Sequence, residues 1–96
     1  MSKLIEKAVA ALNDRLSGAG FDSVAKFVLE GAGTIVIDGS GARAGDDPAE
    51  VTLTATAEVF EQILAGELNP TAAFMSGRLS VDGDMGLAMK LASVLA

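Results

Sequence analysis

The sequence contains no cysteine, histidine, tryptophan or tyrosine among its 96 residues. The absence of cysteine and histidine excludes a disulfide framework, a Cys/His zinc site, a cysteine nucleophile and an imidazole base. A chain of this length can form one domain with a hydrophobic core, but not two domains joined by a linker. We therefore expect residues 1–96 to form a single non-enzymatic domain with no catalytic residue, metal or cofactor.

Basic residues are also scarce: seven Lys and Arg face thirteen Asp and Glu, giving a net charge of −6. Such a balance repels phosphate backbones, so we expect no nucleic-acid partner. The longest uninterrupted apolar run, Ala8–Leu12, is far shorter than the roughly 18 residues that cross a bilayer. The charges at Lys3, Glu6 and Lys7 do not fit a signal peptide. The sequence favours a cytoplasmic monomer with at most transient membrane contact.

The hydrophobic content is nevertheless 50%, although aromatic residues make up only 4%. The surplus is clearest in the last helix expected, over residues 85–95. Its only polar side chains, Lys90 and Ser93, share a single stripe with Gly86. Either this helix is clamped between other elements, or one face covers a sheet while another lines an apolar cavity. Three of the four methionines, all in the last quarter, are either core residues or an adaptable apolar pocket lining.

The hydrophobic periodicity predicts an α+β fold, because helical and alternating patterns both occur. Asn69 is expected to cap a short helix that begins at Pro70, and Asp84 is expected to cap the last one. We expect strands over 21–30, 34–38, 42–44, 51–56 and 78–82, and helices over 4–16, 59–64, 70–76 and 85–95.

The tripeptide Asp22–Ser23–Val24 resembles the site at which acyl carrier proteins bear phosphopantetheine on a serine. In those proteins the serine opens a helix, whereas the residues after Ser23 here alternate as in a strand. An acyl carrier, modified on Ser23, is therefore a minor alternative.

The segment Phe60–Leu91 carries four pieces of one family signature in order. They are Asn69–Pro70, Ala73–Phe74, Ser76–Gly77–Arg78–Leu79 and the run from Gly83 to Leu91. Together they closely resemble the sterol carrier protein type-two family over about a third of the chain.

This resemblance implies a twisted, mostly antiparallel five-stranded sheet, with helices packed on one face and enclosing an apolar tunnel. It implies non-catalytic binding and transfer of fatty acids, fatty acyl-CoA, phospholipids or sterol-like ligands. The alternative is a regulatory or protein-interaction domain of the same fold with a closed core. The residues expected in the tunnel wall are Phe60, Ile63, Leu64, Phe74, Met75, Met85, Leu87, Met89 and Ala92.

Overall fold

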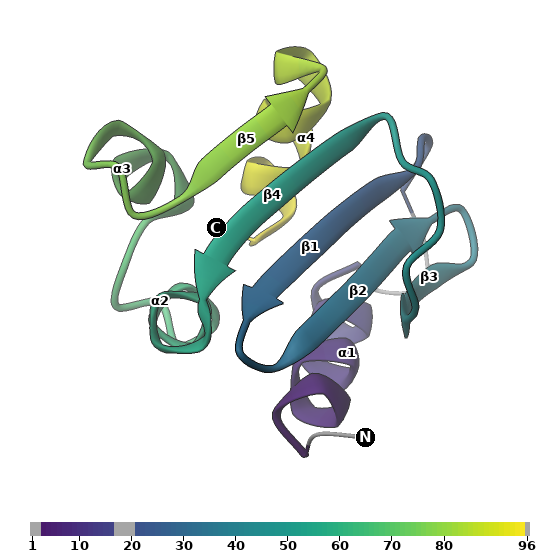
Figure 1. Ribbon diagram of the computed structural model, residues 1–96, viewed down its shortest axis with the longest axis horizontal. Coiled ribbons are helices and arrows are strands. Elements are labelled where there is room, and N and C mark those ends of the chain that lie inside the picture. Colours follow the sequence, from purple (N-terminus) through teal and green to yellow (C-terminus); the bar gives the residue numbers. More distant parts are fainter. Residues whose placement is uncertain (1–2, 17–20, 96) are drawn as a thin grey trace.

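A computed structural model describes residues 3–16 and 21–95 of the chain. Figure 1 looks onto a sheet with α1 and α4 behind it, so the helices gather on one face of the strands. The helices are α1 (Lys3–Leu16), α2 (Ala57–Leu64), α3 (Pro70–Met75) and α4 (Met85–Leu95). The strands are β1 (Ala25–Glu30), β2 (Gly33–Asp38), β3 (Gly41–Ala44), β4 (Val51–Thr56) and β5 (Ser80–Gly83).

Within the described residues, five strands form one sheet in the order β3-β2-β1-β4-β5. β1 pairs with β4 in parallel, and the other three pairings are antiparallel. The parallel pair requires the chain to leave β3, at one edge, and return on the far side of β1. The expected mostly antiparallel α+β fold is therefore confirmed, and one central pairing is parallel.

One face of the sheet packs against the helices, and alternate side chains of each strand point toward it. In β4, Val51, Leu53 and Ala55 are buried, whereas the threonines between them are not. Phe27 of β1 lies on the same face and packs edge-on against Phe60 of α2, with ring centroids 4.6 Å apart. This contact joins the centre of the sheet to the helical layer.

The connection between β3 and β4 runs over the other face of the sheet, in front of β2 in Figure 1. Gly45 lies against Cγ2 of Val36, which explains why this outward-pointing valine is fully buried. Lys26 of β1 holds the connection with an ion pair of 2.9 Å to Asp46. Glu50 donates its N–H to the Val24 carbonyl just before β4 begins.

The two predicted helix caps are confirmed. The Asn69 carboxamide oxygen accepts a hydrogen bond of 2.8 Å from the N–H of Thr71, with Pro70 in the first helical position. The Asp84 carboxylate accepts one of 3.1 Å from the N–H of Leu87. Both side chains satisfy backbone donors that have no partner within the helix.

The first strand begins later than the alternation predicts, at Ala25 rather than at Phe21. Phe21 is buried and donates its N–H to the Asp38 carbonyl, but it lies before the paired region. Since Ser23 precedes a strand and not a helix, the acyl carrier alternative is wrong.

Candidate functional site

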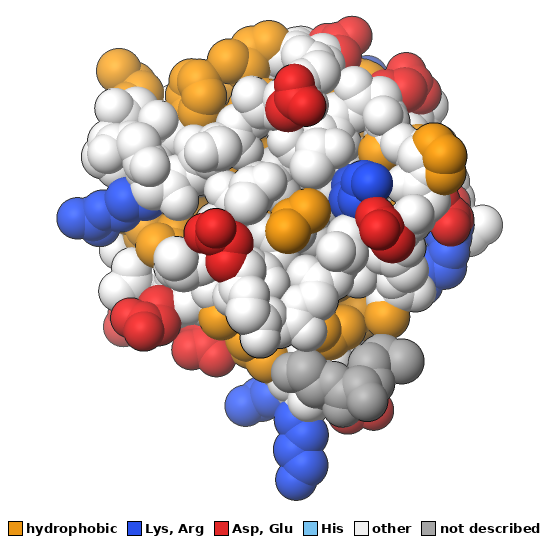
Figure 2. Space-filling model, viewed as in Figure 1, with side chains coloured by type: hydrophobic (Ala, Val, Ile, Leu, Met, Phe, Trp, Pro, Cys, Tyr) orange, Lys and Arg blue, Asp and Glu red, His pale blue; other side chains and the backbone are white. Residues whose placement is uncertain are grey.

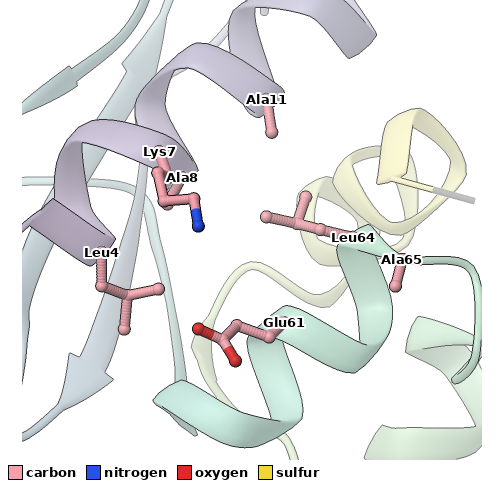
Figure 3. Close-up of a pocket in the computed structure, with 7 residues that line it drawn as sticks. All are labelled: Leu4, Lys7, Ala8, Ala11, Glu61, Leu64 and Ala65. Atoms are coloured by element: carbon pink, nitrogen blue, oxygen red, sulfur yellow. The ribbon is translucent and has the colours of Figure 1, made fainter.

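A groove of about 400 Å³ runs between α1 and the end of α2 (Figure 3). This volume lies within the range of roughly 300–1,000 Å³ that small-molecule pockets occupy. The lining residues are Leu4, Lys7, Ala8 and Ala11 from α1, with Glu61, Leu64 and Ala65 at α2. All of them are apolar except Lys7 and Glu61, so the groove has an apolar floor and two charges.

The groove follows from the spacing of these residues along two helices. Positions three and four apart lie on one helical face, which brings Lys7, Ala8 and Ala11 to the side of α1 that meets α2. Alanine ends at a single methyl group, so Ala8 and Ala11 leave space where longer side chains would fill the contact. Leu64 extends from α2 into this space.

Side chains near the end of α1 hold both walls in place. Arg15 donates a hydrogen bond of 2.5 Å to the carbonyl of Leu64, one of the carbonyls at the α2 terminus that lack helical partners. A positive charge at this end of α2 also interacts favourably with the helix dipole. Asn13 both accepts from the N–H of Ala42 and donates to its carbonyl, at 2.8 and 3.0 Å, which fixes α1 to edge strand β3.

The two charged residues of the groove carry their charges into the space between the helices. In Figure 3 the ammonium group of Lys7 projects from α1, and the carboxylate of Glu61 projects from α2 toward it. Over residues 3–16 and 21–95, neither side chain has an ion pair or a hydrogen bond. Within the described part of the chain, the groove therefore presents a cation and an anion without partners beside an apolar floor.

Three residues predicted for the tunnel wall lie in the hydrophobic core. Phe60 and Ile63 of α2 are 0% and 1% exposed, and Ala92 of α4 is 8% exposed. In this structure their side chains fill the layer between sheet and helices. Their place in a tunnel wall stays a prediction.

Three other predicted wall residues are half-buried at the edge of the core. Leu64 lines the groove between α1 and α2, so it is the predicted residue that the structure brings to this site. Phe74 of α3 and Leu87 of α4 pack against the core away from the groove.

The three predicted methionines lie on the surface. Met75 is 81% exposed, and Met85 and Met89 are 46% and 47% exposed. Figure 2 shows hydrophobic side chains along the upper left edge of the molecule, over α3 and the start of α4. The apolar excess of α4 is therefore partly uncovered, and the role of these methionines in ligand binding stays a prediction.

Six groove residues were not predicted as site residues from the sequence: Leu4, Lys7, Ala8, Ala11, Glu61 and Ala65. Ala8 belongs to the apolar stripe of α1, and such a stripe predicts core packing rather than a groove. The small alanines on one face of α1 were the feature that could have indicated a groove. They indicate one only when α2 is known to pack against that face.

The part of the chain that the structure describes has no cluster of three acidic, histidine or cysteine residues able to hold a metal ion. Among the same residues, every helix is too short or too polar to span a bilayer. The lining of the groove offers a ligand apolar contacts from five residues and the charges of Lys7 and Glu61.

The model of the SCP-2 sterol transfer family matches residues 3–96. Hydroxysteroid dehydrogenase-like protein 2 of Xenopus tropicalis is 34% identical over 97 residues, covering 93% of this chain and 23% of the relative. Peroxisomal multifunctional enzyme A of Dictyostelium discoideum is 40% identical over 78 residues, covering 81% of this chain and 17% of that protein. The chain thus corresponds to less than a quarter of either relative.

A solved structure with the same fold is sterol carrier protein-2 of Aedes aegypti in complex with the C16 fatty acid palmitate. It shares 26% sequence identity and a TM-score of 0.77, and the match covers 100% of this chain and 97% of that chain. The family match over almost the whole sequence agrees with the sheet and helices described above. The chain belongs to the SCP-2 sterol transfer family.

Proposed function

We propose that this chain is a non-catalytic carrier that binds and transfers lipids, with long-chain fatty acids as a ligand class. The observation that carries the proposal is the groove of about 400 Å³ between α1 and α2, with its apolar floor. The palmitate complex of the Aedes aegypti protein, which has the same fold, supports an acyl chain as the ligand.

Apolar burial supplies the binding free energy in this proposal. Each methylene group removed from water contributes about 0.8 kcal/mol, so a chain of several methylenes offsets the cost of immobilising the ligand. The acyl chain enters beside Ala8, Ala11 and Leu64.

The named dehydrogenases and multifunctional enzymes among the relatives do not change this proposal, because the chain matches a minor part of them. We propose that the domain performs no chemical step and uses no cofactor. The other ligand classes of the proposal are fatty acyl-CoA, phospholipids and sterol-like molecules. We further propose that the protein is a cytoplasmic monomer whose contact with membranes is transient.

The test is lipid binding by the full chain and by a variant with a blocked groove. Ala11→Phe places a ring in the groove, whereas Ala10→Phe, on an exposed position next to it, serves as the matched control. We expect the wild type and Ala10→Phe to bind a fluorescent fatty acid that added palmitate displaces. Ala11→Phe should bind the fluorescent fatty acid at least about tenfold more weakly. No binding by the wild type, and no lipid extracted from the purified protein, would contradict the proposal.

A second candidate is a protein-interaction domain with a closed core. The three exposed methionines favour it, because large exposed apolar side chains often mark contact surfaces. A mass that rises with concentration, together with absent lipid binding, would support this candidate over the carrier.

A further inference from the structure

We propose that Lys7 binds the carboxylate of the fatty acid and that Glu61 opposes additional negative charge. These two residues then make the groove selective for ligands with a single anionic head group, above all free fatty acids. The inference rests on the proposed carrier function and names which of its ligand classes the groove accepts best.

Lys7 differs from most other cations of the described chain in having no partner. Lys26, Arg43 and Lys90 each form ion pairs with aspartates at 2.6–2.9 Å. Arg15 is hydrogen-bonded to the carbonyl at the end of α2. Lys7 has neither kind of partner within the described ranges, although its ammonium group points into the groove (Figure 3). It can therefore accept an anionic ligand without giving up an existing interaction.

The position of Lys7 also suits an amphiphilic ligand. Its neighbours on the α1 face are Leu4, one turn before it, and Ala11, one turn after it, and both line the groove. A lysine stem packs along apolar surface while its charged end stays in contact with water. A carboxylate held by the ammonium group therefore has its methylene chain next to Ala8, Ala11 and Leu64.

Glu61 sets the upper limit on the charge of the ligand. Its carboxylate faces the same space from α2 and has no partner among the described residues. Glu61 repels each negative charge that enters the groove, so a single carboxylate beside Lys7 is repelled less than a head group with several phosphates. The chain as a whole carries a net charge of −6, which adds to this repulsion. We therefore expect fatty acyl-CoA to bind more weakly than the free acid.

The test compares four proteins with three ligands by isothermal titration calorimetry. The proteins are the full-length wild type, Lys7→Met, Glu61→Gln and the control Lys3→Met, an exposed lysine on the same helix. The ligands are dodecanoate, the uncharged dodecanol and dodecanoyl-CoA. Methionine preserves the length and apolar character of the lysine stem, and melting temperatures establish that each variant is folded.

We expect the wild type to bind dodecanoate more tightly than dodecanol, and dodecanol more tightly than dodecanoyl-CoA. Lys7→Met lowers the dodecanoate affinity about three- to tenfold and leaves that of dodecanol unchanged, because one charge-assisted contact in a half-open groove is lost. Glu61→Gln raises the affinities for dodecanoate and dodecanoyl-CoA. Lys3→Met changes none of them.

Two failures are distinguishable. If the wild type binds none of the three ligands, the carrier function itself is wrong. If it binds them but Lys7→Met affects dodecanoate and dodecanol equally, or neither, the carrier function stands and the head-group role of Lys7 is refuted.

Discussion

Asn13 holds α1, and with it one wall of the groove, against the edge of the sheet. Its carboxamide exchanges two hydrogen bonds with the backbone of Ala42, at 2.8 and 3.0 Å, as a neighbouring strand would. A protein hydrogen bond contributes about 0.5–1.5 kcal/mol, and water can replace part of this pair at the sheet edge. We therefore expect Asn13→Ala to lower the free energy of unfolding by about 1–2 kcal/mol. For a domain of this size, that corresponds to a melting temperature about 4–15 °C lower.

Asn13→Asp separates the two bonds. The carboxylate still accepts from the N–H of Ala42, but it loses the donor and places negative charge against the Ala42 carbonyl. It should destabilise the protein at neutral pH at least as much as Asn13→Ala. Urea unfolding followed by circular dichroism measures both variants, with Lys3→Ala on the same helix as the control. Unchanged stability of Asn13→Ala, or wild-type stability of Asn13→Asp, would refute the reasoning.

Three further predictions concern the core, an ion pair and the surface. Phe60 is fully buried against Phe27. Phe60→Ala should therefore lower the free energy of unfolding, measured by urea titration, by about 3–5 kcal/mol. A loss below about 1 kcal/mol would show that the contact is loosely packed. Lys90 lowers the pKa of Asp22 below its ordinary value of 3.8, through a hydrogen bond and then through its charge. The stabilisation is therefore present above pH 3.8 and is lost as the pH falls through the lowered pKa. Asp22→Asn should therefore make the free energy of unfolding fall less steeply as the pH is lowered below 3.8. An unchanged slope would disprove the contribution of the Asp22–Lys90 ion pair. Because Met75 is 81% exposed, hydrogen peroxide should convert it to the sulfoxide before the methionines of α4, as peptide mass spectrometry will show; the reverse order would argue that Met75 is covered in solution.

Local features were predictable from the sequence where a short segment contains all the relevant chemistry. The alternation from Val51 to Ala55 gave a strand because every second residue faces the core. Asn69 and Pro70 gave a helix start because their side chains act on the next few backbone groups. The family signature over Phe60–Leu91 supplied the arrangement of the strands and helices, which periodicity alone left open.

Features that depend on how distant segments pack were not predictable in the same way. The parallel pairing of β1 with β4 depends on the crossing connection that buries Val36. The groove depends on α1 and α2 meeting at Ala8 and Ala11, which as sequence indicate only core residues. The apolar pattern of α4 predicted partners for most of its surface, yet Met85 and Met89 are about half exposed.

The most direct test of the central claim is a titration of the ¹⁵N-labelled chain with dodecanoate, followed by backbone amide NMR signals. We predict saturable shifts concentrated at the groove, at Lys7, Ala8, Ala11, Leu64 and Ala65, with smaller changes on the outer face of the sheet. Shifts confined to α3 and α4, or no shifts at all, would contradict the account of a fatty-acid carrier that binds its ligand between α1 and α2.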